Sequence, residues 1–418
     1  MIRCITLLLP IALALGCRTP VQKRFFSAAE LGQRVVAGPE KAGGGNHCCR
    51  VYESYTPDTL HLDHVPLKYV KVNVHFMNSA DSTRNFNGRE GVDYARGILD
   101  AAMYDIETND KLYLPYGNDL PALPPRYRYV LTPRPDDPDD DGIYFHYDDE
   151  LYYYVVMGQN RNRSSRAVVE KYGVQLDTVL NIFFLPHHPD SVASTTYDPY
   201  RCGIALGQAI KIAGGYENSK QFWDIRQVLN HEIAHIYGLT HTWAYNDGCD
   251  DTPKNPRCWN RTDTPPCDTA ASNNLMDYNA YQNAWSPCQI GKIHYHMANE
   301  TGRARKFLVP NWCELHDDRH IVIRDSIHWQ GAKDLEGNLT VAAGGSLRIS
   351  CRTSIPRGGK ITVQAGGKLI LDNCRLHNAC GDDWEGIEIQ KTAEQEGQVV
   401  VIGQPIVENC RSFYMVSP

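Results

Sequence analysis

Hydrophobic and polar residues alternate with two different periods along the first three quarters of the chain. Apolar residues at every second position predict strands, and apolar residues three and four positions apart predict amphipathic helices. The predicted strands cover about 70–76, 127–131 and 179–185, the last apolar enough to be central in a sheet. The predicted helices cover about 89–108, 225–237 and 289–307.

Two later regions break this pattern. From 238 to 285 the periodicity fades and Pro, Asn, Asp, Gly and Cys dominate, so we expect disulfides to hold this segment. Near the end, Leu339-Thr-Val-Ala-Ala-Gly-Gly-Ser-Leu recurs as Ile361-Thr-Val-Gln-Ala-Gly-Gly-Lys-Leu, and Trp384 begins a further similar stretch. Short strands repeated at a fixed offset predict an all-β region, a β-solenoid or else a β-sandwich with similar hairpins. Because the last repeat looks incomplete, the sequence is expected to be truncated.

The first residues resemble an export signal. Arg3 precedes a short apolar run, which is shorter than the roughly 20 residues that span a bilayer, and Cys17 follows it. This pattern predicts a lipoprotein signal peptide over 1–17 with lipidation at Cys17, or a secreted protein that is cleaved nearby. Membrane contact is then expected only through the lipid anchor. The remaining chain divides into a pro-segment or tether (18–62), a catalytic region (63–312) and the β-repeat region (320–418).

Charge and cysteine content limit the functions that the chain can have. The 418 residues carry a net charge of −7 without any basic run, which argues against nucleic acid as a partner. Fourteen cysteines in an exported chain indicate disulfides. The sequence leaves the oligomeric state open.

The strongest chemical signal is His231-Glu232-Ile-Ala-His235-Ile-Tyr-Gly238-Leu-Thr-His241. Residues four apart on a helix share a face, so His231 and His235 can bind one metal ion. Gly238 allows a sharp turn that brings His241 round as a third ligand. Three protein ligands leave one position open, as in catalytic Zn²⁺ sites. Glu232 is rotated away from the ligands and is predicted to act as the general base.

A second motif, Asn273-Asn-Leu-Met276-Asp-Tyr278, lies beyond the third histidine. Together the two motifs resemble the metzincin metalloproteases, and among them the pappalysin (cytophagalysin) family. This resemblance covers about 65–310. It implies an α+β catalytic domain with a twisted sheet, two long helices and an irregular lower subdomain. It also implies that Met276 forms an apolar floor under the metal and that Tyr278 stabilises the oxyanion.

The resemblance implies a zinc-dependent endopeptidase that cleaves protein or peptide substrates. The substrate would lie along an edge strand within about 203–213 by strand addition. The alternative is a catalytically silent surface protein that binds partners through its β-repeat region. Because Glu232 and all three histidines are present, the sequence favours the enzyme. A zinc hydrolase acting on a non-peptide substrate is disfavoured by Met276 and Tyr278.

The cysteines give two further predictions. Cys249, Cys258, Cys267 and Cys288 crowd after the histidine motif and are predicted to form two disulfides, for which sequence alone allows three connectivities. The resemblance implies Cys249 with Cys267 and Cys258 with Cys288. Nearer the start, Cys49, or else Cys48, is a candidate zymogen thiol that would occupy the open metal position. The alternative is that these cysteines form disulfides, for example with Cys202.

The acidic turn Asp136-Asp137-Pro138-Asp139-Asp140-Asp141 has a composition that could bind Ca²⁺, because Ca²⁺ prefers several oxygen ligands on a flexible turn. It lacks a complete calcium-loop pattern. A solvated acidic loop is therefore the preferred interpretation.

Overall fold

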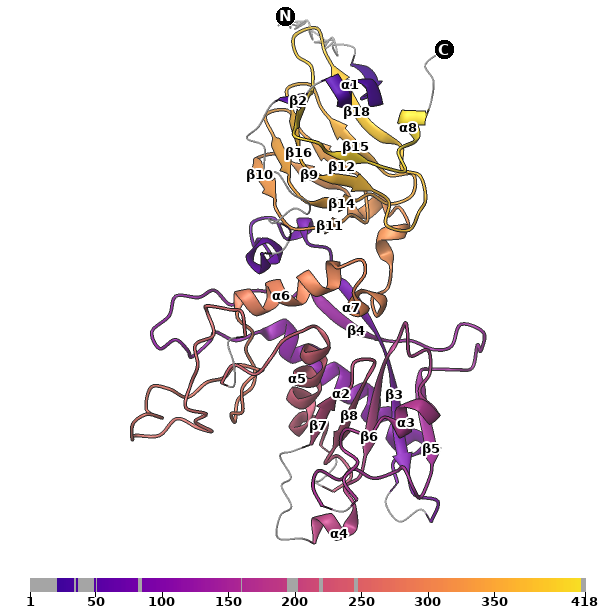
Figure 1. Ribbon diagram of the computed structural model, residues 1–418, viewed down its shortest axis with the longest axis vertical. Helices are drawn as coiled ribbons and strands as arrows, with labels where there is room; N and C mark the ends of the chain where they lie inside the picture. The colour runs from indigo at the N-terminus through magenta and orange to yellow at the C-terminus, as the bar shows by residue number, and fades with distance from the viewer. Residues whose placement is uncertain are drawn as a thin grey trace, which may run out of the picture.

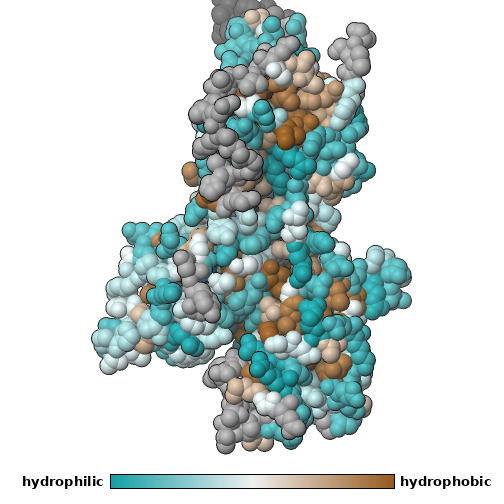
Figure 2. All heavy atoms as spheres, in the orientation of Figure 1, coloured by the Kyte–Doolittle hydropathy of each residue, from teal (hydrophilic) through white to brown (hydrophobic). Residues whose placement is uncertain are grey.

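The computed structural model describes residues 21–33, 35–36, 49, 51–81, 85–158, 160–193, 202–217, 221–243 and 247–414. These residues form an α/β region and a region of stacked β-strands, with helices α6 and α7 lying where the two regions meet (Figure 1). On the face seen in Figure 2, hydrophobic atoms gather in small groups between hydrophilic ones in both regions. Within the described ranges, no helix is both long and apolar enough to cross a membrane.

The α/β region is built on one largely parallel sheet. Its strand order is β4-β3-β6-β8-β7, with β5 also paired to β3, and only β7 runs antiparallel to its neighbour. The central β6 is buried at every residue, as its apolar sequence predicts. The strands are β3 (Lys68–Asn78), β4 (Tyr127–Leu131), β5 (Ile143–Tyr147), β6 (Leu180–Leu185), β7 (Gly203–Ala205) and β8 (Ala209–Ala213).

Helices cover both faces of this sheet. On one face, the long α2 (Gly88–Thr108) and α5 (Arg226–Ile236) pack their apolar stripes on β3, β6 and β8. On the other face, α3 (Ala167–Tyr172) packs against a smaller apolar cluster. A short α4 (Pro189–Val192) follows β6. The helix predicted over 289–307 is divided into α6 (Pro287–Ala298) and α7 (Arg303–Lys306), because a turn closed by Gly302 N–H and the Asn299 carbonyl (2.9 Å) separates them.

The C-terminal strands form three parallel stacks, which agrees with the repeat that the sequence predicts. Leu339 pairs with Ile361 and Leu347 with Leu369, so the two sequence copies lie one above the other. The repeat copies therefore pair in parallel, whereas the strands of a hairpin pair antiparallel. The first stack is β9 (Ile321–Ile323), β12 (Leu339–Val341), β15 (Lys360–Val363) and β18 (Gly386–Lys391). The second is β10 (Ser326–Trp329), β13 (Ser346–Ile349), β16 (Lys368–Asp372) and β19 (Gln398–Ile402). The third is β11 (Lys333–Asp334), β14 (Arg352–Ser354), β17 (Arg375–His377) and β20 (Ile406–Val407), and the short α8 (Arg411–Tyr414) follows.

The described part of the predicted pro-segment or tether is built into these stacks. Strand β1 (Gln22–Phe25) pairs antiparallel with β18, and β2 (Val35–Val36) pairs parallel with β19. Between them lies α1 (Ala28–Gln33), and Phe26 is fully buried in the core of the repeat region. The start of the described chain therefore covers the last strands of the first two stacks.

A disulfide fastens the next part of this segment. Cys49 is bonded to Cys351, and the 3-10 helix at Tyr52–Tyr55 packs on α6, where Tyr55 meets Tyr295 edge to face. The hypothesis of a zymogen thiol at Cys49 is therefore wrong, because its sulfur is already bonded. The disulfide alternative is right, although the partner is Cys351 and not Cys202. Cys48 and Cys17 lie outside the described residues.

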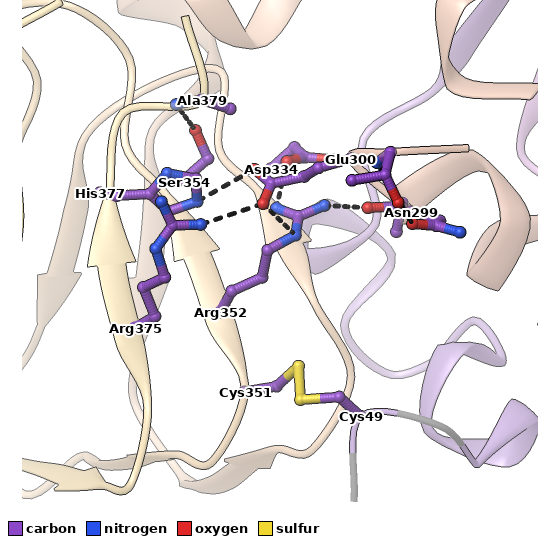
Figure 3. Close-up of polar contacts among 12 residues, drawn as sticks. Cys49, Asn299, Glu300, Asp334, Cys351, Arg352, Ser354, Arg375, His377 and Ala379 are labelled. Carbon is purple, nitrogen blue, oxygen red and sulfur yellow. Dashed lines mark hydrogen bonds and ion pairs between the residues drawn. A yellow bond between two sulfur atoms is a disulfide. The ribbon is translucent and has the colours of Figure 1, made fainter. Parts of the chain in front are cut away.

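A buried ion cluster joins the two regions (Figure 3). Asp334 of β11 accepts hydrogen bonds from Arg305 of α7 at 2.6 and 3.0 Å and from Arg352 of β14 at 2.7 Å. Burial alone would raise the pKa of Asp334, but Arg352 and Arg305 hold it well below its usual range. Glu300, just after α6, lies 3.1 Å from the Arg375 guanidinium. The two regions therefore share an ion cluster to which each supplies charges that the other neutralises.

Candidate active site

Helix α5 and the turn after it bring the three predicted metal ligands together. His231 and His235 lie one turn apart on α5, and the helix ends at Ile236. Gly238 then adopts φ +81°, and a Cβ there would lie 2.4 Å from His296 Nε2. Glycine is thus required both for the backbone angle and for space. The chain turns back at this point and presents His241 to the other two imidazoles.

The three imidazoles meet at their Nε2 atoms. The distances between these atoms are 3.1 Å (His231 to His241), 3.2 Å (His231 to His235) and 3.2 Å (His235 to His241). Nitrogen ligands about 2.0–2.1 Å from a tetrahedral Zn²⁺ are about 3.3–3.4 Å apart, so the observed triangle is close to that size. The site therefore fits a zinc ion.

The opposite ring nitrogens make the hydrogen bonds that such a site needs. Nδ1 of His231 lies 2.6 Å from the Leu275 carbonyl and Nδ1 of His235 lies 2.8 Å from the Leu239 carbonyl. A carbonyl can only accept, so Nδ1 carries the proton and Nε2 keeps its lone pair. Burial, reinforced by His235, lowers the pKa of His231 to about 3 and that of His241 to about 4. The rings are neutral, as metal ligands must be.

Glu232 faces a cavity beside these ligands. The cavity has a volume of about 360 Å³ and is also lined by His235, His241 and strand β7. The Glu232 side chain is buried, and burial raises its pKa to about 7. A Cβ at Gly203 of β7 would lie 2.4 Å from Glu232 Oε1, so a larger residue there would force the carboxylate to shift. The arrangement places a proton acceptor of suitable strength between the ligands and the sheet edge.

A buried asparagine fixes the position of α5. Asn230 accepts a hydrogen bond from the Tyr129 hydroxyl (2.8 Å) on β4 and donates one to the Ala102 carbonyl (3.0 Å) on α2. Sequence analysis missed this residue. The sequence feature that could have revealed it is a polar residue next to His231, within a helix that packs on the core.

The loop over 273–278 packs against the histidines, and its Leu275 carbonyl is the partner of His231 Nδ1. Met276 is fully buried, and its N–H donates to Asn274 Oδ1 at 2.8 Å. The Tyr278 ring centroid lies 5.2 Å from that of His241 and 4.1 Å from that of Trp243. Tyr278 is 43% exposed and lines the cavity, so its ring is within reach of a bound molecule.

Comparison with known proteins finds similar chains among solved structures. No family model and no curated protein matches the chain. Among solved structures, mirolysin in complex with compound 9 is similar over 58% of this chain and 96% of that chain, with 15% sequence identity and a TM-score of 0.39.

The irregular segment is held by disulfides, but not with the pairing that the resemblance implied. Cys249 is bonded to Cys288 and Cys258 to Cys267, so the expected Cys249–Cys267 and Cys258–Cys288 pairs are wrong. The start of α6 explains the first bond. Asp251 accepts hydrogen bonds from the Ser286 hydroxyl (2.6 Å) and the Cys288 N–H (2.9 Å), which draws this loop to the helix end.

The described part of the chain holds two groups of potential metal ligands. One is the histidine triad; the other contains Cys249 and Cys288, which are joined as a disulfide and cannot bind a metal as thiolates. The acidic turn does not form such a group within the described residues. Its Asp140 instead accepts a hydrogen bond from the Tyr144 hydroxyl (2.9 Å). A calcium requirement stays an untested prediction.

Peptide mapping without reduction is expected to recover the four linked pairs Cys49–Cys351, Cys249–Cys288, Cys258–Cys267 and Cys313–Cys380. Disulfides persist in the oxidising compartments to which exported proteins go, so the purified protein should contain these bonds. The measurement is mass spectrometry of a proteolytic digest after thiol alkylation. Alkylated Cys49, or a Cys249–Cys267 peptide, would contradict the structure.

Proposed function

We propose that this protein is a zinc-dependent endopeptidase of the metzincin type, as the pappalysin-like motifs predict. The observation that supports this most is the triangle of three neutral imidazoles next to the buried carboxylate of Glu232. His231, His235 and His241 would hold the metal. A bound zinc ion lowers the pKa of a coordinated water to about 7 and polarises the substrate carbonyl.

Glu232 then acts as the general base and afterwards as the general acid. Its carboxylate accepts a proton from the water that attacks the peptide carbonyl, and the same oxygen returns this proton to the leaving amine. Burial of Glu232 favours this role, because a base with a pKa of about 7 can both take up and release a proton at neutral pH.

The sheet edge offers a place for the substrate backbone. Strand β7 pairs only with β8 among the described strands, so no described strand covers its other edge. This edge belongs to the segment 203–213 that the sequence predicts, and it borders the cavity next to Glu232. A peptide can add to this edge as a further strand, which would hold an extended chain across the site.

Tyr278→Phe is expected to leave zinc binding unchanged and to lower kcat about 10²-fold, the typical effect of removing one oxyanion donor. The Tyr278 ring stands beside His241, so its hydroxyl can reach a carbonyl oxygen bound in the cavity. Steady-state kinetics on a peptide substrate measure the effect. A raised KM with unchanged kcat would instead assign Tyr278 to substrate binding.

The setting of the reaction is proposed to be extracellular. Four disulfides are typical of proteins that fold in an oxidising compartment. The signal sequence predicts either a lipid-anchored surface protein or a secreted one. We assign attachment or substrate presentation to the repeat region, as a β-solenoid.

Metal analysis combined with a peptidase assay tests the proposal. We expect one zinc per chain, loss of peptide cleavage after chelation, and recovery when zinc is returned. A protein that binds zinc but cleaves no peptide would support the alternative, a catalytically silent surface protein that binds through its repeat region.

A further inference from the structure

Arginine side chains surround the cavity next to the histidine triad. Arg163, from the loop before α3, and Arg303, the first residue of α7, both line it. Arg257 lies beside Tyr278, a residue that lines the cavity, with the guanidinium carbon 5.6 Å from the Tyr278 ring centroid and 5.2 Å from that of Trp243. These residues are far apart in the sequence, and the fold brings their charges to one place.

None of these three guanidinium groups forms an ion pair with a residue that the structure describes. Most other described arginines do have a carboxylate within 4.0 Å; examples are Arg226, Arg305, Arg319, Arg348, Arg352, Arg357, Arg375 and Arg411. In addition, Arg163 Nε is buried and has no hydrogen-bond partner. A buried donor without a partner is costly, so an acceptor that arrives with a ligand would relieve it.

The turn between β7 and β8 makes room for one of these charges. Gly207 has φ +83°, and a Cβ there would lie 2.4 Å from Arg303 Nη1. The guanidinium therefore lies directly against the turn that ends the edge strand. Arg163 lies on the same cavity, so a side chain that enters it meets cationic donors from two separate elements.

The charge of the cavity differs from that of the whole protein. The chain carries −7 overall, whereas Glu232 is the only acidic residue among the described residues that line this cavity. A concave site lined by charges of one sign concentrates ligands of the opposite sign. The planar guanidinium group also matches a carboxylate, to which it can donate two parallel hydrogen bonds.

We propose that this cleft selects peptides that place an aspartate or glutamate side chain in the cavity between Arg163 and Arg303. This inference rests on the proposed peptidase function and specifies its substrate class. Arg257 adds to the attraction beside Tyr278. Because the attraction is electrostatic and the arginines are partly exposed to solvent, the acidic preference is expected to weaken as the salt concentration rises.

Cleavage profiling with a peptide library tests the inference on the zinc-loaded, full-length protein. We expect one substrate position to favour Asp and Glu over Gln by about 10-fold or more, in line with charge-assisted hydrogen bonds. Arg163→Glu and Arg303→Glu should each reduce this preference and shift it toward Lys and Arg. Arg303 is exposed, so its replacement should not affect folding. Arg161→Glu, an exposed charge reversal two residues from Arg163, is the matched control and should keep the wild-type preference.

A binding measurement gives a second readout that needs no turnover. The Glu232→Gln protein, titrated with fluorescent peptides that differ only in Glu, Gln or Lys at the selected position, should bind the Glu peptide most tightly. Cleavage without acidic preference, or a preference that survives both charge reversals, would overturn this inference and leave the peptidase proposal intact. Failure to cleave any peptide would overturn both.

Discussion

Glu232→Gln is expected to lower the rate of peptide hydrolysis by at least about 10²- to 10⁴-fold, the usual contribution of a general base. The substitution keeps the size of the side chain but removes the proton acceptor. Glu232 is not one of the three candidate metal ligands. Glutamine has the same shape as glutamate, so it fits the space between the cavity and Gly203. The zinc content is therefore expected to stay at the wild-type level.

The measurement pairs kcat/KM on a peptide substrate with metal analysis of the same sample. Glu170→Gln is a suitable control, because Glu170 is an exposed residue of α3 and does not line the cavity. It should have wild-type activity. A Glu232→Gln protein that remains fully active would rule out the assigned role, whatever its metal content.

Asp334→Asn is expected to lower the free energy of unfolding by about 3–5 kcal/mol, the typical effect of removing one partner from a buried ion pair. The variant leaves Arg305 and Arg352 buried without their shared counter-charge. Urea unfolding at pH 7 measures the change. Because the pKa of Asp334 is held low in the folded protein, its stabilisation is complete above the unfolded pKa of about 3.9. The difference between wild type and variant should shrink as the pH falls below that value.

Glu314→Gln is the matched control for Asp334→Asn. Glu314 pairs with Arg357 on the surface, where both side chains are more than half exposed. Such pairs contribute about 0–1 kcal/mol. An equally small effect at Asp334 would show that the junction between the two regions is not held by this cluster. Truncation near Pro310 is expected to destabilise the protein for the same reason. It would remove Asp334 and Cys351, and so leave Arg305 and Cys49 without these partners.

Local sequence patterns predicted those parts of the structure that depend on near neighbours. Strand β4 coincides with its prediction, and α2 and α5 begin within one residue of theirs. The spacing of the histidine motif indicated that its imidazoles would meet, because the helix repeat and Gly238 are enough to determine that. The division of the last predicted helix into α6 and α7 was missed, although Gly302 marks the turn.

Features that depend on distant segments could not be predicted in this way. Strand β1 has four exposed residues without any apolar alternation, so nothing in Gln22–Phe25 indicates a partner in β18. The disulfide pairs depend on how the loop meets α6, which cysteine spacing does not encode. Likewise, Arg163 and Arg303 converge only because the loop before α3 and the start of α7 both border the cavity.

The pairing of β1 with β18 also imposes an order on folding. Synthesis delivers β1 ahead of the whole α/β region, and its partner becomes available only after most of the repeat region has been made. Contacts between such distant segments form slowly, because a long stretch of chain must be ordered first. After β18 has been made and until β1 pairs with it, one edge of β18 is uncovered. An uncovered strand edge can pair with another chain. Closure of this edge is therefore expected to be a late step in maturation and the stage at which the protein is most prone to aggregate.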